Sequence, residues 1–360
     1  TASDEVKCVY TLEAAEDDDD DSDPSLWTDP VVKVGKDELE ATSATSYTGW
    51  LHDSSGNLKG SFTMKVGKAS KKTGLAKVTL TVTDLETGAK KKYTGKYNAE
   101  DGAFEDGQLE DLEVGANGVV GKIGKETLTG GRTADKQEAQ SIDSVYKNLI
   151  FAFAFQNTAG KNVKGAATFT AKFSSKGKAK ISGTLMDGTK VSTTAQLIVG
   201  DSGCALPVSF TKRNKANFGL VLWFDKKKAT FKEATGLVTC TLNDGTDVKV
   251  DFVGCAKVDG VLPKAKSLTV DGKKVAELAP APNGKKWTAT AAKDFGTAKP
   301  KLSFAAKKGT FTGSYKATVK GAAKPVTAKI TGVWLGKSGG VGTAVMKVNK
   351  VVTAFPVQIK

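Results

Sequence analysis

Two nearly identical octapeptides place an acidic residue beside a glycine: TLMDGTKV at Thr184–Val191 and TLNDGTDV at Thr241–Val248. A carboxylate in such a loop can ligate a metal ion, act as an acid or base, or stabilise a chain reversal. A three-residue loop that ends in glycine puts the apolar residues of both flanks on one face, whereas a two-residue loop puts them on opposite faces. We therefore predict two G1-bulge hairpins and no acidic site. The predicted turn residues are Asp187, Gly188, Asp244 and Gly245.

A third stretch, LTVDGKKV at Leu268–Val275, is also typical of a hairpin. Here a two-residue turn gives the better match, because it pairs Leu268 with Val275.

The stretch GDSG at Gly200–Gly203 matches the nucleophile motif of chymotrypsin-like proteases, and His52 precedes it along the chain. Such a protease needs a histidine base, a carboxylate that orients it and an oxyanion hole. The sequence contexts of that family are missing around both His52 and Ser202, so we interpret this stretch as a turn after a strand.

GKSGG at Gly336–Gly340 matches G-x-S-x-G, but a strand-like run follows it where a nucleophile elbow needs a helix. We predict no enzyme activity and no catalytic residue.

Metal and cofactor sites are not predicted either. His52 is the only histidine, too isolated for a metal site, and we expect it at the surface. The acidic run Glu16–Pro24 lacks the spacing and central glycine of an EF-hand. We interpret it as a flexible linker and leave open whether Asp17–Asp23 bind calcium.

The four cysteines form no C-x-x-C pair, which disfavours a structural zinc site. Two disulfides in an exported protein are predicted, with three possible connectivities; free buried thiols are the alternative. The disulfide candidates are Cys8, Cys204, Cys240 and Cys255.

The formal net charge of +14 is unevenly distributed along the 360 residues. Residues 1–40 hold 14 Asp and Glu against 3 Lys, a net of −11, which leaves 50 basic and 25 acidic residues, a net of +25, in the rest of the chain. Arg132 and Arg213 are the only arginines, and nucleic-acid readers rely on arginine for bidentate contacts. We therefore expect no specific nucleic-acid binding. Acidic polysaccharide or cell-envelope material is the favoured partner of so lysine-rich a surface.

Short runs that alternate apolar and polar residues recur along the chain, as in half-buried strands. In GLAKVTLTVTDL (Gly74–Leu85), Ala76, Val78, Leu80 and Val82 face one way, and lysine and threonine face the other. Turn signals separate these runs at roughly 8–12-residue spacing. The fold class is therefore all-β, with tandem antiparallel β-sandwich or β-barrel units and one short helix between them.

The helix interrupts the strand pattern at TADKQEAQSIDSVYKNLIF (Thr133–Phe151), where apolar residues are three and four positions apart. This spacing predicts a helix over about 134–147. FAFAF at Phe151–Phe155 then alternates large and small side chains, as a core strand would. The predicted segments are an acidic N-terminal arm and linker (1–40), a first β domain (41–131), a connecting helix (132–147), a second β domain (148–262), and residues 263–360 as a third domain or the second half of the second.

The N-terminal segment holds another alternating run, KCVYTL at Lys7–Leu12. Such a strand can add to the sheet edge of a neighbouring subunit, with Asp17–Asp23 as a linker, or it can complete its own domain. We predict that it drives self-association into multimers or filaments. The candidate assembly residues are Lys7, Val9, Tyr10 and Leu12.

These patterns predict an exported, non-enzymatic structural or cell-surface protein. The alternative is a module that binds carbohydrate or anionic glycan, in which aromatic side chains on a sheet face stack on sugars; aromatic residues on strands more often belong to the core. No run of 18 apolar residues is present, so no transmembrane segment is expected. The aromatic candidates are Trp27, Trp50, Trp223, Trp287, Trp334, Tyr47, Tyr93 and Tyr97.

The pattern K-x-K-x-x-G-T-L-x-D-G-T-K-V-S with a following Q-L-I-V-G, at Lys178–Gly200, resembles a repeat in large exported Lys/Gly-rich proteins of the Verrucomicrobia–Lentisphaerae group. Tyr47–Val82 and Lys301–Val319 are similar to other parts of the same proteins, so the resemblance covers most of residues 45–350. It implies an exported protein of β domains at an extracellular or cell-surface location. It implies no functional site.

Overall fold

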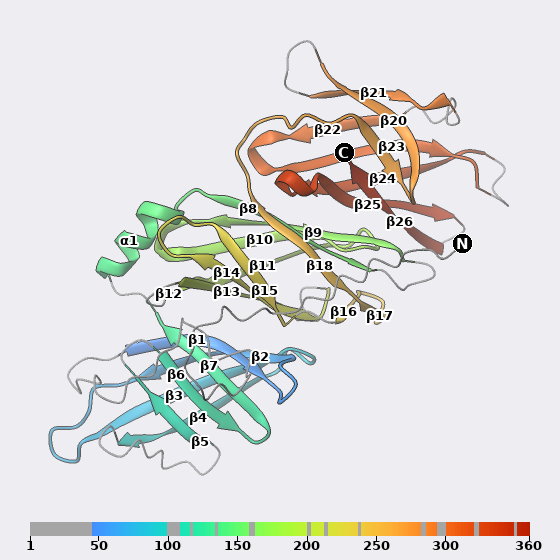
Figure 1. The fold of residues 1–360 in the computed structure, drawn as a ribbon. Helices are drawn as coiled ribbons and strands as arrows, with labels where there is room; N and C mark the ends of the chain where they lie inside the picture. The colour runs from blue at the N-terminus through green and yellow to red at the C-terminus, as the bar shows by residue number, and fades with distance from the viewer. Residues whose placement is uncertain are drawn as a thin grey trace, which may run out of the picture.

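The computed structural model describes residues 45–98, 109–115, 118–133, 136–157, 163–199, 203–211, 215–236, 239–281, 286–293, 300–319, 324–348 and 351–360. The predicted all-β class is confirmed, because antiparallel sheets dominate these residues and they include one α-helix (Figure 1). The strands fall into three consecutive groups, which we call the first, second and third units. Within the described ranges, no helix is long and apolar enough to cross a membrane.

The first unit is a seven-stranded sheet with the order β4-β3-β2-β1-β7-β6-β5. Its strands follow one another as neighbours, except that the first strand also pairs with the last. The strands are β1 (Thr45–His52), β2 (Leu58–Val66), β3 (Leu75–Asp84), β4 (Lys90–Asn98), β5 (Glu110–Val114), β6 (Gly118–Ile123) and β7 (Glu126–Arg132).

The second unit opens with the helix α1 (Lys136–Tyr146), which lies within the predicted range. Its five-stranded sheet has the order β11-β10-β9-β8-β18, and its four-stranded sheet has the order β12-β13-β14-β15. The strands are β8 (Ile150–Asn157), β9 (Gly165–Phe173), β10 (Lys178–Thr184), β11 (Lys190–Gln196), β12 (Ile198–Val199), β13 (Gly203–Phe210), β14 (Phe218–Asp225), β15 (Phe231–Thr235), β16 (Thr239–Thr241), β17 (Asp247–Lys249) and β18 (Asp251–Lys257).

The third unit is an eight-stranded sheet with the order β21-β20-β19-β26-β25-β24-β23-β22. The strands β19 to β26 thus form a sheet of their own around a separate apolar core. The strands are β19 (Ser267–Val270), β20 (Lys273–Pro280), β21 (Trp287–Ala291), β22 (Lys301–Ala305), β23 (Thr310–Ala317), β24 (Val326–Trp334), β25 (Gly340–Val348) and β26 (Val351–Ile359).

All three units share one way of joining their ends. The first strand of each pairs antiparallel with the last: β1 with β7, β8 with β18, and β19 with β26. In the second unit β11 also lies beside β13, and β15 lies beside β18, so the two sheets curve into a nearly closed barrel. The inner face of this barrel holds the apolar core of the second unit.

The inner face of the second unit is packed with phenylalanine. Phe153 and Phe169 stack with ring centroids 5.1 Å apart, and Phe210 and Phe218 stack at 4.7 Å. The helix α1 adds Ile142 and Tyr146 to this core at one end of the unit, while the β16–β17 hairpin lies at the other end (Figure 1). The fully buried phenylalanines of this core are Phe151, Phe153, Phe155, Phe169, Phe173, Phe210, Phe218 and Phe224.

Glycine on a nearby strand of the same sheet makes room for a core aromatic ring in the outer units. In the third unit, a Cβ on Gly332 would collide with the ring of Phe311 and with the carbonyl oxygen of Val341. In the first unit, a Cβ on Gly130 would collide with the ring of Phe62. The close approach of ring to backbone therefore requires glycine at both positions.

Strand β8 joins the second unit to the third. Ala152 and Ala154 point away from the phenylalanine core and pack against Val333 and Val341 of the third unit. Beside them, the buried hydroxyl of Thr343 accepts a hydrogen bond from the Ala166 N–H and donates one to the Ala166 carbonyl, both at 2.8 Å. The alternation in FAFAF therefore corresponds to two different interfaces: the phenylalanines face the core of the second unit, and the alanines face the third unit.

The first unit contacts the opposite side of the second unit. Trp50 of β1 meets Trp223 of β14 edge to face, with centroids 5.7 Å apart. Around them lie Leu58, Ile198, Ala205 and Val221, which form one buried apolar cluster with the two tryptophans.

We expect Gly332→Ala to destabilise the protein by about 1–3 kcal/mol, because overpacking a filled core costs this much. Gly203→Ala is the matched control: its Cβ would meet only the Phe224 carbonyl oxygen, at 3.4 Å. Denaturant unfolding of both variants measures the difference. Equal stability of the two variants would contradict the close approach described above.

We expect Thr343→Val to cost about 1–3 kcal/mol, because two buried backbone groups of Ala166 lose their partner. Thr331, which lies opposite Thr343 in the β24–β25 ladder and is only half-buried, provides the control substitution Thr331→Val. Thermal unfolding compares the two, and a Thr343→Val protein as stable as the control would show that this contact does not hold the units together.

Candidate functional site

The two Asp-Gly turns have the predicted register. Leu185 donates its N–H to the Thr189 carbonyl at 2.8 Å, and Gly183 lies opposite Val191. The side chain of Asp187 accepts bonds from the N–H and the hydroxyl of Thr189, both at 2.8 Å. Gly188 has a φ of +87°, the left-handed conformation that a G1 bulge needs. The carboxylate therefore stabilises the turn.

The second copy repeats this geometry. Leu242 donates its N–H to the Thr246 carbonyl at 2.8 Å, Cys240 lies opposite Val248, and Gly245 has a φ of +88°. The carboxylate of Asp244 accepts the N–H of Thr246 at 3.0 Å, which lowers the pKa of that carboxyl.

The third hairpin differs from the expectation in one detail. The turn has two residues, Asp271 and Gly272, both at positive φ. A β-bulge after Leu268 then shifts the ladder, so Leu268 lies opposite Ala276 instead of Val275.

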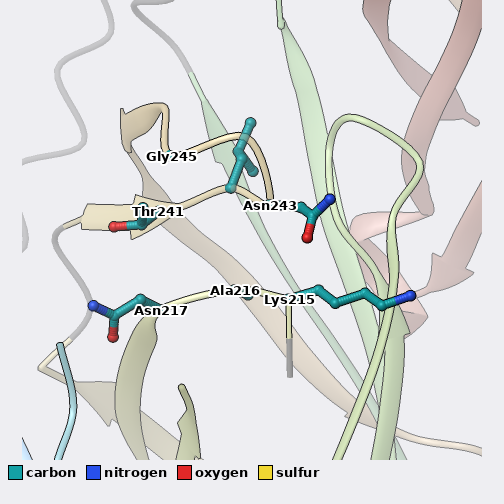
Figure 2. Close-up of a pocket in the computed structure, with 7 residues that line it drawn as sticks. Lys215, Ala216, Asn217, Thr241, Asn243 and Gly245 are labelled. Carbon is teal, nitrogen blue, oxygen red and sulfur yellow. The ribbon is translucent and has the colours of Figure 1, made fainter. Parts of the chain in front are cut away.

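A small hollow of about 230 Å³ lies between the second turn and the segment that precedes β14 (Figure 2). Backbone hydrogen bonds of 2.9 and 3.0 Å join Asn217 and Thr241, two of the residues that line it. Figure 2 shows the Lys215 side chain and the Asn217 amide extending in opposite directions. The lining offers one charged group and no acid–base pair, so it gives no catalytic arrangement. Its residues are Lys215, Ala216, Asn217, Thr241, Leu242, Asn243 and Gly245.

The two-disulfide prediction is wrong. Any pairing of four cysteines into two disulfides joins at least two of the three described ones, yet Cys204, Cys240 and Cys255 are all free thiols. Burial raises the pKa of Cys204 to about 11 and that of Cys240 to about 12, and it raises the pKa of Cys255 further. Each thiol serves as a small apolar core residue and is poorly nucleophilic. Cys8 lies outside the described residues.

The expectation of a surface histidine is also wrong. The His52 side chain is 7% exposed in the first unit. Its Nδ1 donates to the Asp53 carbonyl at 3.1 Å, and its Nε2 faces the Thr129 hydroxyl at 3.4 Å. Burial lowers the pKa of His52, which favours the neutral ring. The histidine is thus a structural partner, while Ser202 lies outside the described residues.

The G-x-S-x-G match at Gly336–Gly340 also has a structural role. Gly336–Ser338 forms a single 3-10 turn, and β25 follows it directly, so no helix stands behind Ser338. No three His, Cys, Asp or Glu side chains gather as a metal site would require, among the residues that the structure describes. The calcium question at Asp17–Asp23 and the assembly strand Lys7–Leu12 lie outside those residues.

Six of the eight aromatic candidates for stacking on sugars belong to the interior, whereas Trp334 is only partly buried and Trp27 lies outside the described residues. Tyr47, Tyr93 and Tyr97 are buried in the core of the first unit, and Trp287 is buried in the third. Trp50 and Trp223 are buried between two units. Stacking on an exposed aromatic face is therefore not available from these residues.

The outer faces of the units instead carry rows of lysine, threonine and serine. We name the outward residues of β2–β4, β9–β11 and β22–β24 the lysine–hydroxyl surface. Cross-strand neighbours form its rows, which run across adjacent strands about 4.8 Å apart. Representative rows are Lys65–Thr79–Thr94, Thr63–Thr81–Lys92 and Lys77–Lys96 in the first unit, Lys172–Lys180–Thr194 and Thr170–Ser182–Ser192 in the second, and Lys301–Ser314–Lys329 in the third.

Two rows of this surface place lysines directly opposite each other. Lys77 faces Lys96 across β3 and β4, and Lys172 faces Lys180 across β9 and β10. All four side chains are exposed. In the part of the chain that the structure describes, no carboxylate lies within ion-pair distance of Lys172 or Lys180. Like charges in directly opposed positions repel, so the Lys172–Lys180 row is a region of concentrated positive potential.

The sequence predicted a lysine-rich surface but not its rows, because it gives no register between strands. The signal is nevertheless present in the alternation: in KVTLTVTD of β3 and KAKISGT of β10, every second residue is lysine, threonine or serine. The pairing of strands was needed to show which lysines are neighbours.

No protein-family model matches the chain, and no curated protein matches it. Among solved structures, the chain is similar to a protein of unknown function from the DUF3598 family of Nostoc punctiforme. The two are 11% identical, with a TM-score of 0.18, and the match covers 59% of this chain and 94% of that chain. A similarity at this TM-score carries no information about fold or function.

The buried neutral His52 predicts a pH dependence of stability. Because the pKa of His52 is lower in the folded than in the unfolded state, the unfolded state binds more protons below the unfolded value of about 6.5. We therefore expect the free energy of unfolding to fall as the pH drops from about 7 towards 5. Urea unfolding at several pH values, compared with His52→Gln, isolates this contribution; identical pH profiles of the two proteins would contradict it.

Proposed function

We propose that this protein binds an anionic polysaccharide on its lysine–hydroxyl surface and catalyses no reaction. The observation that carries the proposal is the placement of Lys172 opposite Lys180 on the exposed outer face of β9 and β10. This pair holds two positive charges together, and an anion that lies between them removes the repulsion. An extended polyanion can follow such rows from strand to strand.

The hydroxyl groups of the same rows favour a carbohydrate ligand. Ser182 lies two residues from Lys180 on β10 and opposite Ser192 on β11, and all three side chains are exposed. Ammonium groups donate to sulfate or carboxylate oxygens, while serine and threonine hydroxyls both donate to and accept from sugar hydroxyls. A surface that combines both suits a charged, hydroxyl-rich polymer better than a purely charged one.

The choice of lysine over arginine supports the same partner. Lysine is a hydrated point charge, and it attracts an anionic surface without the bidentate geometry that base and phosphate recognition uses. Of the two functions that the sequence predicts, the described surface favours glycan binding. A structural role at an extracellular or cell surface is compatible with it, since acidic polysaccharides are abundant there and a bound polymer anchors the protein.

We expect Lys172→Gln/Lys180→Gln to weaken binding to immobilised dextran sulfate by roughly tenfold or more. This factor follows because each lysine near an anionic surface contributes about 1 kcal/mol to the binding free energy. The affinity should also fall steeply with salt, because the contacts are exposed. Surface plasmon resonance at two salt concentrations measures both effects, and uncharged dextran serves as the reference polymer.

The matched control is Lys264→Gln/Lys337→Gln, which removes the same charge from two exposed loop lysines. It should bind nearly as tightly as the unaltered protein. Equal weakening of the two double variants would show that only net charge matters, and the proposed surface would be wrong. Binding to uncharged dextran with the same affinity would also overturn the proposal.

A further inference from the structure

In the barrel of the second unit, two strands lie side by side without backbone pairing among the described residues. We call the gap between them the seam. β15 stands at the end of the four-stranded order and β18 at the end of the five-stranded order, and the two strands lie beside each other. Between them is a groove of about 450 Å³. Its lining consists of residues 231–236 on one side and 250–254 on the other.

The floor of the groove is apolar. The rings of Phe231 and Phe252 lie against each other with centroids 5.5 Å apart, and Phe231 also contacts Phe224 of the core at 6.0 Å. Val250 is buried beside them, while Phe231 and Phe252 are only partly covered. The floor is therefore core surface that the barrel leaves half-buried.

The wall formed by β15 offers a backbone edge. This strand pairs with β14 through Val221–Thr235 and Leu222–Ala234, and among the described residues its other edge has no ladder partner. An edge strand beside an apolar groove is a template for an added strand, in which main-chain hydrogen bonds give affinity and alternate side chains enter the groove.

We propose that residues Glu5–Leu12 of this chain bind in the groove as a strand antiparallel to β15. The sequence EVKCVYTL places Val6, Cys8, Tyr10 and Leu12 on one face of a strand. Those side chains cover Phe231 and Phe252, and the alternate residues face solvent. Eight residues extend about 26 Å, which exceeds the length of β15.

Charge fixes the direction of the added strand. The turn before β15 carries Lys227 and Lys228, and Lys232 follows at the start of the strand. A strand antiparallel to β15 ends at this turn, so the acidic run Glu16–Asp23 that follows Leu12 meets these lysines. The opposite direction would carry the acidic run away from them. Charge complementarity therefore favours the antiparallel orientation.

The segment can reach the groove of its own chain or of a second copy. Between Leu12 and Thr45, where β1 begins, lie 32 residues that extend up to about 105 Å. Both routes fill the same groove. The proposal does not depend on polysaccharide binding, because the groove is distinct from the lysine–hydroxyl surface.

The test uses the full chain with Tyr10 replaced by the photoreactive residue p-benzoylphenylalanine. After irradiation and digestion, mass spectrometry should find position 10 crosslinked to peptides that contain residues 231–236 or 250–254. The matched control carries the same group in place of Thr11, whose side chain faces the other way, and it should crosslink to these peptides severalfold less. Interchain and intrachain products both count as occupancy of the groove.

A second variant tests the floor. Ala234→Asp, added to the position-10 protein, should reduce the crosslink severalfold, whereas Glu233→Gln on the exposed side of β15 should leave it unchanged. The comparison of positions 10 and 11 leaves the groove unaltered, so it holds even where Ala234→Asp does not fold. Equal yields from positions 10 and 11, or crosslinks from position 10 that map elsewhere, would overturn the proposal.

Discussion

Strand β8 is buried on both faces and hydrogen-bonded along both edges, and the other elements depend on it. One face carries phenylalanines that fill the core of the second unit, and the other carries alanines that pack on the third unit. Along its edges it pairs with β9 and with β18, which joins the start of the unit to its end. Burial of each phenylalanine contributes about 1.5–3 kcal/mol, so this strand concentrates much of the apolar free energy of the unit.

Because the inner faces are occupied by core and two outer regions by neighbouring units, the remaining outer faces and one seam are left for function. The exposed outward positions of β9 and β10 are polar, and the chain places Lys172 opposite Lys180 there. The seam lies between β15 and β18 because each of these strands stands at the end of its own sheet. The same arrangement of strands thus leaves two distinct surfaces, one charged and one apolar.

Local patterns predicted local structure well. The Asp-Gly turns at Asp187 and Asp244 follow from register, and the helix follows from three- and four-residue spacing, since both depend on residues close in sequence. The failed predictions concern distant partners. Cys204 and Cys240 remain unpaired in the phenylalanine core, and His52 is buried because Thr129, far along the chain, lies beside it. No local pattern contains that information.

The sequence alone determined the all-β class, the turn chemistry and the single helix before FAFAF, because the preferences of turns, strands and helices act over a few residues. The lysines were visible in composition, but their opposition across β3–β4 and β9–β10 was decided by strand pairing. Only the tertiary structure decided which aromatic residues are buried and where an edge remains open. Burial and closure depend on contacts between residues far apart in the chain, which composition and periodicity do not specify.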